Sequence, residues 1–331
     1  MVTIKDIANV CNVSYSTVSR VLNGKTVRPS LRNDKIITTA KALGYNPNNI
    51  AVQLAKGDTK LLGLLIPDVA NPHYSEITKY VEDAALTAGY KIFLCNTDWD
   101  VCKEVMYRDA LLEQRVAGMI VMPVCDKSHA IFRGLDLPVV ILGSHTNETV
   151  LHSVVVDNNV AVGLAVDQLI QHGFSKLVFI SRKPRNITAT EREQGFCRSL
   201  RSHSLRVDAG STVDCGESTN IESACSVARV LLNRDIRPGG IVAFNDFIAL
   251  GVIEAIEEAG LIVGKDIGVV GFDNILFSRL NKISLTSVAP SHSDMAEKAV
   301  RIIVESRKER VPVIRNEVVE PYIYVRSSSG F

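Results

Sequence analysis

The sequence lacks the motifs of common enzyme scaffolds. The nucleophile-elbow pattern G-x-S-x-G, the phosphate-binding loop G-x-x-x-x-G-K-S/T and the dinucleotide pattern G-x-G-x-x-G are all absent. The seven histidines are dispersed without the spacing of metal ligands. We therefore expect no catalytic residues, no metal and no cofactor, and we predict that the chain is not an enzyme.

Long apolar runs and paired cysteines are missing as well. No run approaches the roughly 18 apolar residues that a membrane-spanning helix needs. No signal peptide is recognisable, because Lys5 and Asp6 already stand near the start. The seven cysteines are scattered, odd in number and without a C-x-x-C pair, which is typical of buried thiols in a reducing compartment. A cytoplasmic protein is expected.

What is present suggests two domains of unequal size and charge. A length of 331 residues is enough for about two domains, and 46% hydrophobic residues provide a sizeable core. Residues 1–60 hold nine basic and three acidic side chains, whereas acidic residues outnumber basic ones in the rest. This asymmetry suggests that only the head of the chain meets a polyanion, although chance clustering would give the same count.

The head begins with two short predicted helices. Thr3 and Asp6 have the spacing of a helix cap, and Asn12 tolerates the left-handed conformation of a tight turn. Ser14 then caps a second helix over 15–22, which gives a helix-turn-helix pattern. The apolar positions that share one face of these helices are Ile4, Ile7, Ala8, Cys11, Val18, Val21 and Leu22.

A third helix over 31–43 would close a small core and end at Gly44. It would contribute Ile36, Ile37, Ala40 and Leu43. The second helix is left with a polar outer face of hydroxyls and a guanidinium, the groups that contact phosphates and base edges. A generic helical bundle is the alternative, but it leaves this face unexplained. The face consists of Tyr15, Ser16, Thr17, Ser19 and Arg20.

Three segments of the head form a pattern at fixed spacing: T-I-K-D-I-A-N-V-C-N-V-S-Y-S-T-V-S-R-V-L-N-G, L-G-Y-N-P-N and A-V-Q-L-A. Together they resemble the headpiece of the lactose-repressor/galactose-repressor (LacI/GalR) family of bacterial transcriptional regulators. The resemblance implies a DNA-binding domain over 1–46 and a hinge helix over 47–57 that folds on operator DNA. A segment this short is not a stable helix by itself, so it suits a switch.

The resemblance also assigns roles to residues. Tyr15, Ser16 and Arg20 would read bases in the major groove, and Leu54 would wedge into the minor groove, with Ala51 beside it in the hinge. Contacts to the DNA backbone would come from Thr3, Ser14, Thr17, Ser19, Asn23, Tyr45 and Asn48.

Two positions depart from the family pattern. Asn12 stands where the family usually has glycine, and Arg28-Pro29 stands where it usually has Val-Ser. Either Val27 supplies the missing apolar contact before the third helix, or Ser30 becomes its cap one residue later.

The remaining residues, 58–331, alternate apolar strands with amphipathic helices, which indicates parallel α/β layers. The predicted segments are strands 61–66, 90–95, 118–122, 137–142, 176–181, 240–244 and 267–271, and helices 75–88, 103–115, 159–171, 192–202, 219–233 and 246–259.

Motifs such as E-R-x-x-G-F at 191–196 and N-D-x-x-A-L-G at 245–251 continue the family resemblance. They imply a two-lobed, periplasmic-binding-protein-like domain for effector binding and dimerisation. Lobe one would cover about 60–156 and 288–315, and lobe two about 157–287 and 316–328.

Ligands of parallel α/β sheets bind beyond the carboxyl ends of the strands, where this sequence places carboxylates and amides. Such groups pair with sugar hydroxyls, and Tyr74 would stack on the apolar face of a sugar. By family position Arg192, at the start of a helix, Asn245 and Asp273 are the foremost ligand contacts; helix capping is the alternative for Asp273 and for Asp246. The predicted effector-binding residues are Asp68, Asn71, Tyr74, Asn96, Asp157, Arg192, Asn245 and Asp273.

The loop 182–186 carries three cations near the expected cleft. They favour an anionic effector, such as a sugar phosphate or sugar acid, unless the loop is simply a solvated surface, which is the more ordinary case.

The predicted function is a nucleoid-associated transcriptional repressor of a carbohydrate-utilisation operon. Its partners would be palindromic double-stranded operator DNA, a sugar-type effector and a second copy in a homodimer. Induction, corepression and a partner-protein input all fit the sequence, and a sugar-transport protein or an enzyme on this scaffold is the remote alternative.

Overall fold

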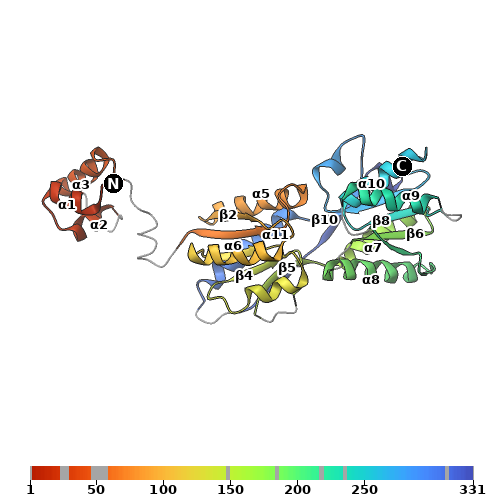
Figure 1. The fold of residues 1–331 in the computed structure, drawn as a ribbon, viewed down its shortest axis with the longest axis horizontal. Helices are drawn as coiled ribbons and strands as arrows, with labels where there is room; N and C mark the ends of the chain where they lie inside the picture. Colours follow the sequence, from red (N-terminus) through yellow and green to blue (C-terminus); the bar gives the residue numbers. More distant parts are fainter. Residues whose placement is uncertain are drawn as a thin grey trace. The chain divides into compact units, whose positions relative to one another are not determined.

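The computed structural model describes residues 2–22, 30–45, 59–146, 150–182, 186–215, 220–233, 237–309 and 313–330. The chain divides into two compact units, Met1–Thr59 and Lys60–Phe331, each of which is drawn in Figure 1. No helix in the described ranges is long and apolar enough to cross a membrane.

The small unit contains helices α1 (Ile4–Cys11), α2 (Tyr15–Leu22) and α3 (Leu31–Ala42). Local sequence sets their ends as predicted. Thr3 and Asp6 form a reciprocal capping box, and Asn12 adopts the left-handed conformation with a φ of 54°. Ser14 Oγ accepts the Thr17 amide at 3.3 Å, and Ser30 caps α3 by accepting the Asn33 amide.

A small apolar core holds these three helices together. Most of the predicted residues are in it, including Ile7 and Ile36, which are fully buried. The prediction was wrong for Ile37 and Leu43, which are 39% and 37% exposed. Three short helices form a core of few side chains. Only a narrow apolar face of each helix contacts it, so residues beside that face remain in solvent.

The second unit is built on two six-stranded sheets. We call the part around the first sheet lobe one and the part around the second lobe two. The first sheet has the order β11-β5-β4-β3-β1-β2 and the second β12-β10-β9-β8-β6-β7. The strands are β1 (Leu61–Ile66), β2 (Lys91–Asn96), β3 (Gly118–Val121), β4 (Val139–Leu142), β5 (His152–Val156), β6 (Leu177–Ser181), β7 (Thr212–Asp214), β8 (Gly240–Ala243), β9 (Gly268–Phe272), β10 (Thr286–Pro290), β11 (Asn316–Val319) and β12 (Pro321–Tyr324).

Helices cover both faces of each sheet (Figure 1). Among the described strands, every pair is parallel except β10 with β12. The helices are α5 (Pro72–Thr87), α6 (Val101–Glu113), α7 (Asn158–Gln171), α8 (Ile187–Ser202), α9 (Ile221–Leu232), α10 (Asp246–Glu258) and α11 (His292–Ser306), and the 3₁₀ helices are η1 (Asp126–Phe132), η2 (Leu276–Arg279) and η3 (Ser327–Ser329).

Side chains of the lobe-one strands alternate between two apolar clusters. Leu64 and Ile120 pack with α5 and α11, whereas Leu65 and Met119 pack with Leu111 of α6. A strand buried on both faces has a continuous apolar sequence, which is why these strands were recognisable from sequence.

The chain crosses between the lobes at three places: after β5, after β10 and between β11 and β12. The prediction placed 316–328 in lobe two, but 316–319 pairs with β5 in lobe one and only 321–324 pairs with β10. The prediction also placed 288–290 in lobe one, whereas these residues belong to β10. The third crossing lies between β11 and β12, which are short and nearly adjacent in the sequence. No polar loop separates them, so the hydrophobic pattern does not show where the chain changes lobes.

Candidate functional site

The exposed face of α2 is the candidate DNA surface of the small unit. Tyr15, Ser16 and Arg20 are exposed, with Tyr15 at 67%, while Thr17 and Ser19 are partly buried. A large exposed tyrosine beside hydroxyls and a guanidinium offers both apolar contact and hydrogen bonding to a groove.

The remaining predicted DNA contacts have structural positions of two kinds. Thr3 and Ser14 cap helices, so their hydroxyls lie at helix N-termini, where phosphates are favoured. Tyr45 packs against the three-helix core and is partly exposed. Asn23, Asn48, Ala51 and Leu54, with the predicted hinge helix, lie outside the described residues.

The second unit contains a cavity of about 370 Å³ lined by both lobes. Many of its lining residues lie just beyond the carboxyl ends of parallel strands, including β1 and β3 of lobe one and β6, β8 and β9 of lobe two. This is the position in which open parallel sheets bind ligands. The predicted effector residues that line it are Asp68, Asn71, Tyr74, Arg192, Asn245 and Asp273.

Arg192 lies inside α8, which begins at Ile187 with Asn186 as its cap, so the prediction that Arg192 begins this helix was wrong. Its Nε donates to Asn158 Oδ1 at 3.1 Å and its Nη1 donates to the Phe244 carbonyl oxygen at 2.5 Å. Burial lowers the pKa of the guanidinium, and the nearby Asp273 carboxylate opposes that shift. Arg192 is therefore a fixed cation whose orientation is set before any ligand arrives.

Aromatic rings flank this cation. Its guanidinium carbon lies 4.3 Å from the centroid of the Phe272 ring and 4.9 Å from that of Phe244. Such contacts hold a planar guanidinium in one plane and leave its edge available for hydrogen bonding.

The loop after β9 presents Asp273 to the cavity. Asp273 has a φ of 98°, a region that costs a non-glycine residue conformational energy and is often found at functional sites. Buried Asp246 stabilises this loop by accepting the Ile275 amide at 2.9 Å and the hydroxyls of Ser278 and Ser287 at 2.5 and 2.7 Å.

Asp246 therefore has a different role from the helix cap considered above. Asn245 caps α10 by accepting the Ile248 amide at 3.0 Å, and it also lines the cavity. Asp246 is fully buried, and burial raises its pKa to about 7.

Lobe one supplies an amide, a carboxylate and two aromatic rings. Asn71 caps α5, and Asp68 Oδ1 accepts the Ala70 amide at 2.9 Å. The rings of Tyr74 and Trp99 are in edge contact, with centroids 5.9 Å apart, and burial raises the pKa of the Tyr74 hydroxyl. These rings form an apolar surface beside the polar groups.

Two predicted effector residues do not line the cavity. Asn96 Oδ1 accepts the Val69 amide at 3.0 Å and its Nδ2 donates to Asp98, while Asp157 caps α7. Both stand at strand ends, as several lining residues do. Their local hydrogen bonds do not set them apart, because Asn71 and Asn245 also cap helices and still line the cavity.

Sequence reasoning missed several lining residues. Trp99, the chain's single tryptophan, and Asn158 line the cavity, as do Phe244 and Ser144. Asn158 was adjacent to a predicted residue, and its position one step into α7 is the signal that could have identified it.

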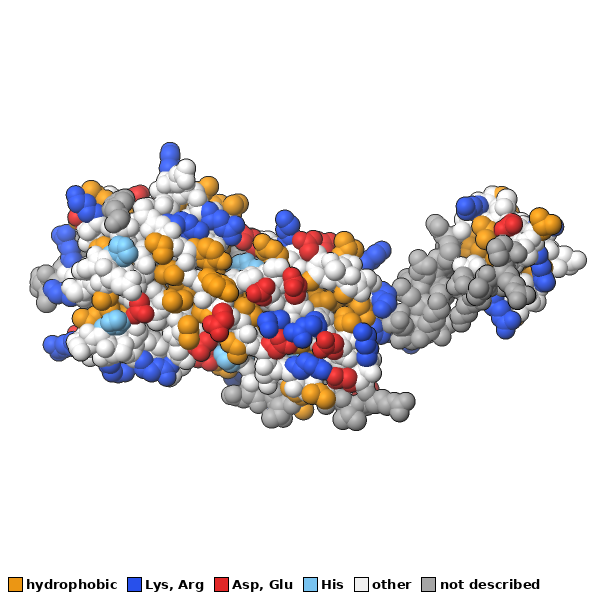
Figure 2. Space-filling view, turned by 180° about the vertical axis from the view of Figure 1, so that it is seen from behind, with side chains coloured by type: hydrophobic (Ala, Val, Ile, Leu, Met, Phe, Trp, Pro, Cys, Tyr) orange, Lys and Arg blue, Asp and Glu red, His pale blue; other side chains and the backbone are white. Residues whose placement is uncertain are grey.

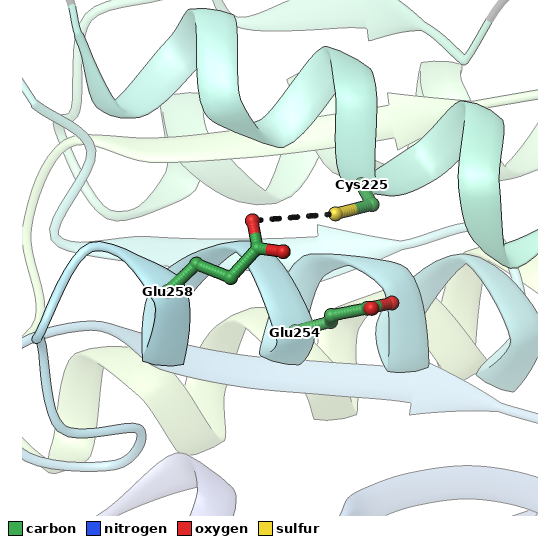
Figure 3. A group of neighbouring side chains, drawn as sticks. All are labelled: Cys225, Glu254 and Glu258. Atoms are coloured by element: carbon green, nitrogen blue, oxygen red, sulfur yellow. Dashed lines mark hydrogen bonds between the residues drawn. The ribbon is translucent and has the colours of Figure 1, made fainter.

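One cluster with metal-ligand spacing occurs within the described ranges, on α9 and α10 (Figure 3). It consists of Cys225, Glu254 and Glu258. None of its three residues lines the cavity. Arg229 donates to both carboxylate oxygens of Glu258, at 2.7 and 2.8 Å, and thereby lowers its pKa. Glu258 is thus held by an ion pair between the two helices, and Cys225 Sγ donates to the same carboxylate at 4.0 Å.

On the face shown in Figure 2, acidic and basic side chains are intermixed over the second unit rather than gathered by sign. Ion pairs within the second unit include Lys298–Glu317 at 2.7 Å and Arg279–Glu76 at 2.9 Å. An intermixed surface lacks the single-sign field that a DNA-binding face presents.

Comparisons with known proteins match both units. A model of bacterial regulatory proteins of the lacI family matches residues 3–48, and a periplasmic binding protein-like domain matches 166–329. Catabolite control protein A of Priestia megaterium is 34% identical over 308 residues, 92% of each chain. The ribose operon repressor of Halalkalibacterium halodurans is 30% identical over 332 residues, which cover 100% of this chain and 98% of that protein.

A solved structure is similar over the same extent. The lac repressor dimer bound to operator and the anti-inducer ONPF has 25% sequence identity and a TM-score of 0.86. The similarity covers 100% of this chain and 99% of that chain, so both units have counterparts in one relative.

Proposed function

Because the chain belongs to the lacI family of bacterial regulatory proteins, we propose that it is a transcriptional repressor of a carbohydrate-utilisation operon. The family consists of transcriptional regulators rather than enzymes. In this proposal a sugar or sugar derivative, bound between the two lobes, controls the affinity of the small unit for operator DNA.

The two-lobed cavity is the observation that carries the proposal. Arg192, Asn245 and Asp273 of lobe two face the same cavity as Asp68, Asn71 and the aromatic rings of lobe one. Carboxylates, amides and one fixed arginine pair with vicinal hydroxyls, and aromatic rings cover the apolar face of a sugar ring. A ligand that contacts both lobes binds one lobe arrangement in preference to another, which is the requirement for control of a distant site.

In the proposed DNA complex, a homodimer binds a palindromic operator, and the similar lac repressor was solved as a dimer bound to its operator. In this proposal Tyr15, Ser16 and Arg20 read the bases of the operator, and the hinge over 47–57 folds when it binds DNA. Edge strand β2 exposes Phe93 (48%) and Leu94 (40%), which favours a dimer contact in lobe one.

The test is an operator gel shift with purified full-length protein and a panel of sugars. One sugar should change the apparent operator affinity by about 5- to 150-fold, the usual range of allosteric coupling. Binding in the cavity should also change the fluorescence of Trp99, which lines it and is the only tryptophan.

Arg192→Ala should remove both responses, because it deletes the cation that Asn158 and Phe244 hold in place. Arg201→Ala, on the exposed last turn of the same helix, is the matched control and should retain them. A response to nucleobases alone, or only to an added protein partner, would contradict a sugar effector while leaving the DNA-binding role in place.

A further inference from the structure

Arg182 is the second arginine of the cavity, and its position differs from that of Arg192. It follows β6 directly, is 8% exposed and lines the cavity. The guanidinium carbon lies 4.9 Å from the centroid of the Trp99 ring in lobe one and 5.8 Å from that of Phe244 in lobe two. The group is therefore buried at the place where both lobes meet the ligand space.

Within the described part of the chain, the buried Nε of Arg182 has no hydrogen-bond partner, and no ion pair joins its guanidinium to a carboxylate. Arg192 differs, since its Nε and Nη1 are bonded to Asn158 and Phe244. Arginine stays protonated in proteins, and an unpaired buried charge is costly. Burial accordingly lowers the pKa of Arg182 from its usual value.

Three of the carboxylates that line the cavity have contacts other than Arg182. Both oxygens of Asp126 accept the Ile187 amide, at 3.1 and 3.0 Å. Asp68 accepts the Ala70 amide, and Asp273 lies 3.8 Å from His73. The charge of Asp126 acts on Arg182 and opposes the lowering of its pKa by burial. None of these three carboxylates forms an ion pair with Arg182, so its donors remain for a ligand.

Given the sugar effector of the proposed function, on which this step rests, we propose that the effector carries an anionic group, a carboxylate or a phosphate, that binds Arg182. The ring contacts fix the plane of the guanidinium, and its edge then offers parallel N–H donors to two anionic oxygens. Arg192, Asn245 and Asp273 contact the hydroxyls. The solvated-loop alternative fails for Arg182, because this residue is buried.

The experiment compares matched probes on the full-length protein. Neutral aldoses such as glucose, galactose and ribose are measured beside their aldonic acids and their terminal phosphates, by Trp99 fluorescence and by thermal shift. An acid or a phosphate should bind, and its neutral parent should bind at least roughly 30-fold more weakly, the usual effect of losing one side of a buried, hydrogen-bonded charge pair. The two anionic arms distinguish a carboxylate from a phosphate.

Arg182→Gln should reduce affinity for the anionic probe by a similar factor and abolish the preference over its neutral parent. Arg182→Lys, which keeps the charge but loses the fork, should retain part of that preference. Arg201→Gln, exposed on α8, is the matched control and should bind as the wild type does. The preference for the anionic probe over its neutral parent is measured on the wild type alone. The proposal can therefore be tested even if the variants fold poorly.

The outcomes separate the two proposals. Equal or tighter binding of neutral sugars overturns the anionic effector and leaves the sugar-responsive repressor standing. Unchanged anion affinity in Arg182→Gln also overturns the role of Arg182. If no neutral or anionic carbohydrate alters fluorescence, melting or operator affinity, the proposed function itself fails.

Discussion

His292 begins α11 as a buried histidine, 8% exposed, with its ring centroid 5.6 Å from that of His73. Burial first, and then neighbouring His73, lowers its pKa to about 4 from the usual 6.5. The unfolded chain therefore binds a proton at His292 between these two values while the folded chain does not. The contribution of neutral His292 to the free energy of unfolding is therefore fully present above pH 6.5 and is lost as the pH falls toward 4.

His292→Gln removes this titration. From about pH 7 to about pH 5, the wild type should lose more stability than the variant, by at most about 1.4 kcal/mol per pH unit. Urea unfolding followed by circular dichroism at both pH values measures the difference. His145→Gln, whose side chain is 41% exposed, is the control, and parallel pH curves for wild type and His292→Gln would refute the assignment.

Single residues of the cavity could be predicted by type but not by orientation. Asp68, Asn71 and Asn245 were identified because polar residues follow apolar strands, and they line the cavity. Asn96 and Asp157 satisfy the same rule, yet they do not line the cavity. Residue type and local hydrogen bonding do not separate the two groups, because Asp68, Asn71 and Asn245 also accept nearby amides.

At the scale of elements, the packing of α9 against α10 depends on Gly251. A Cβ there would lie 2.2 Å from the Ile221 carbonyl oxygen and 2.8 Å from the Cys225 amide nitrogen, both of them backbone atoms. At Gly163 on α7, an added Cβ would have nothing within 4 Å of it. The same substitution should thus have opposite effects at these two helical sites.

Gly251→Ala should destabilise the second unit by about 1–3 kcal/mol or more, because two backbones must separate. Gly163→Ala should stabilise it by up to about 1 kcal/mol, because alanine favours the helix and meets no obstacle. Thermal unfolding of both variants beside the wild type measures the difference. A stabilising Gly251→Ala would show that α9 and α10 do not pack this closely.

Elements with strong local signals were predictable. The small-unit helices have capping residues that the structure bears out at Thr3, Ser14 and Ser30. Strands β5, β7, β10, β11 and β12 were not predicted. Polar residues interrupt these strands, such as His152 and Ser153 in β5 and Thr286 and Ser287 in β10, so no continuous apolar run distinguishes them from loops. Helix α11 was missed as well, although its apolar stripe packs on α5.

At the scale of the whole molecule, the proposed coupling between effector and operator must be reciprocal. If the effector lowers operator affinity by a given factor, saturating operator must lower effector affinity by the same factor. If the effector releases the repressor, we expect operator to lower effector affinity by a factor of about 5–150. If it acts as a corepressor, we expect operator to raise effector affinity by a factor in the same range. Titration of Trp99 fluorescence with and without operator duplex measures it.

A scrambled duplex is the control for that titration, because it occupies the basic surface without the specific complex. Equal effector affinity in the presence of operator and of scrambled DNA would show that the cavity and the DNA site are not coupled.

The sequence by itself determined the two-unit organisation, the family, the three-helix head and the parallel α/β class of the body. These follow from local patterns, namely capping residues, helical stripes and buried strands, whose physical causes act within a few residues. The tertiary structure alone decided which polar side chains face the cavity, that Asp246 holds the Asp273 loop, and that Arg182 is buried between rings of two lobes. Those outcomes depend on contacts between residues far apart in the chain, such as Trp99 and Arg182, and contacts at that separation are set by the packing of sheets and not by local sequence.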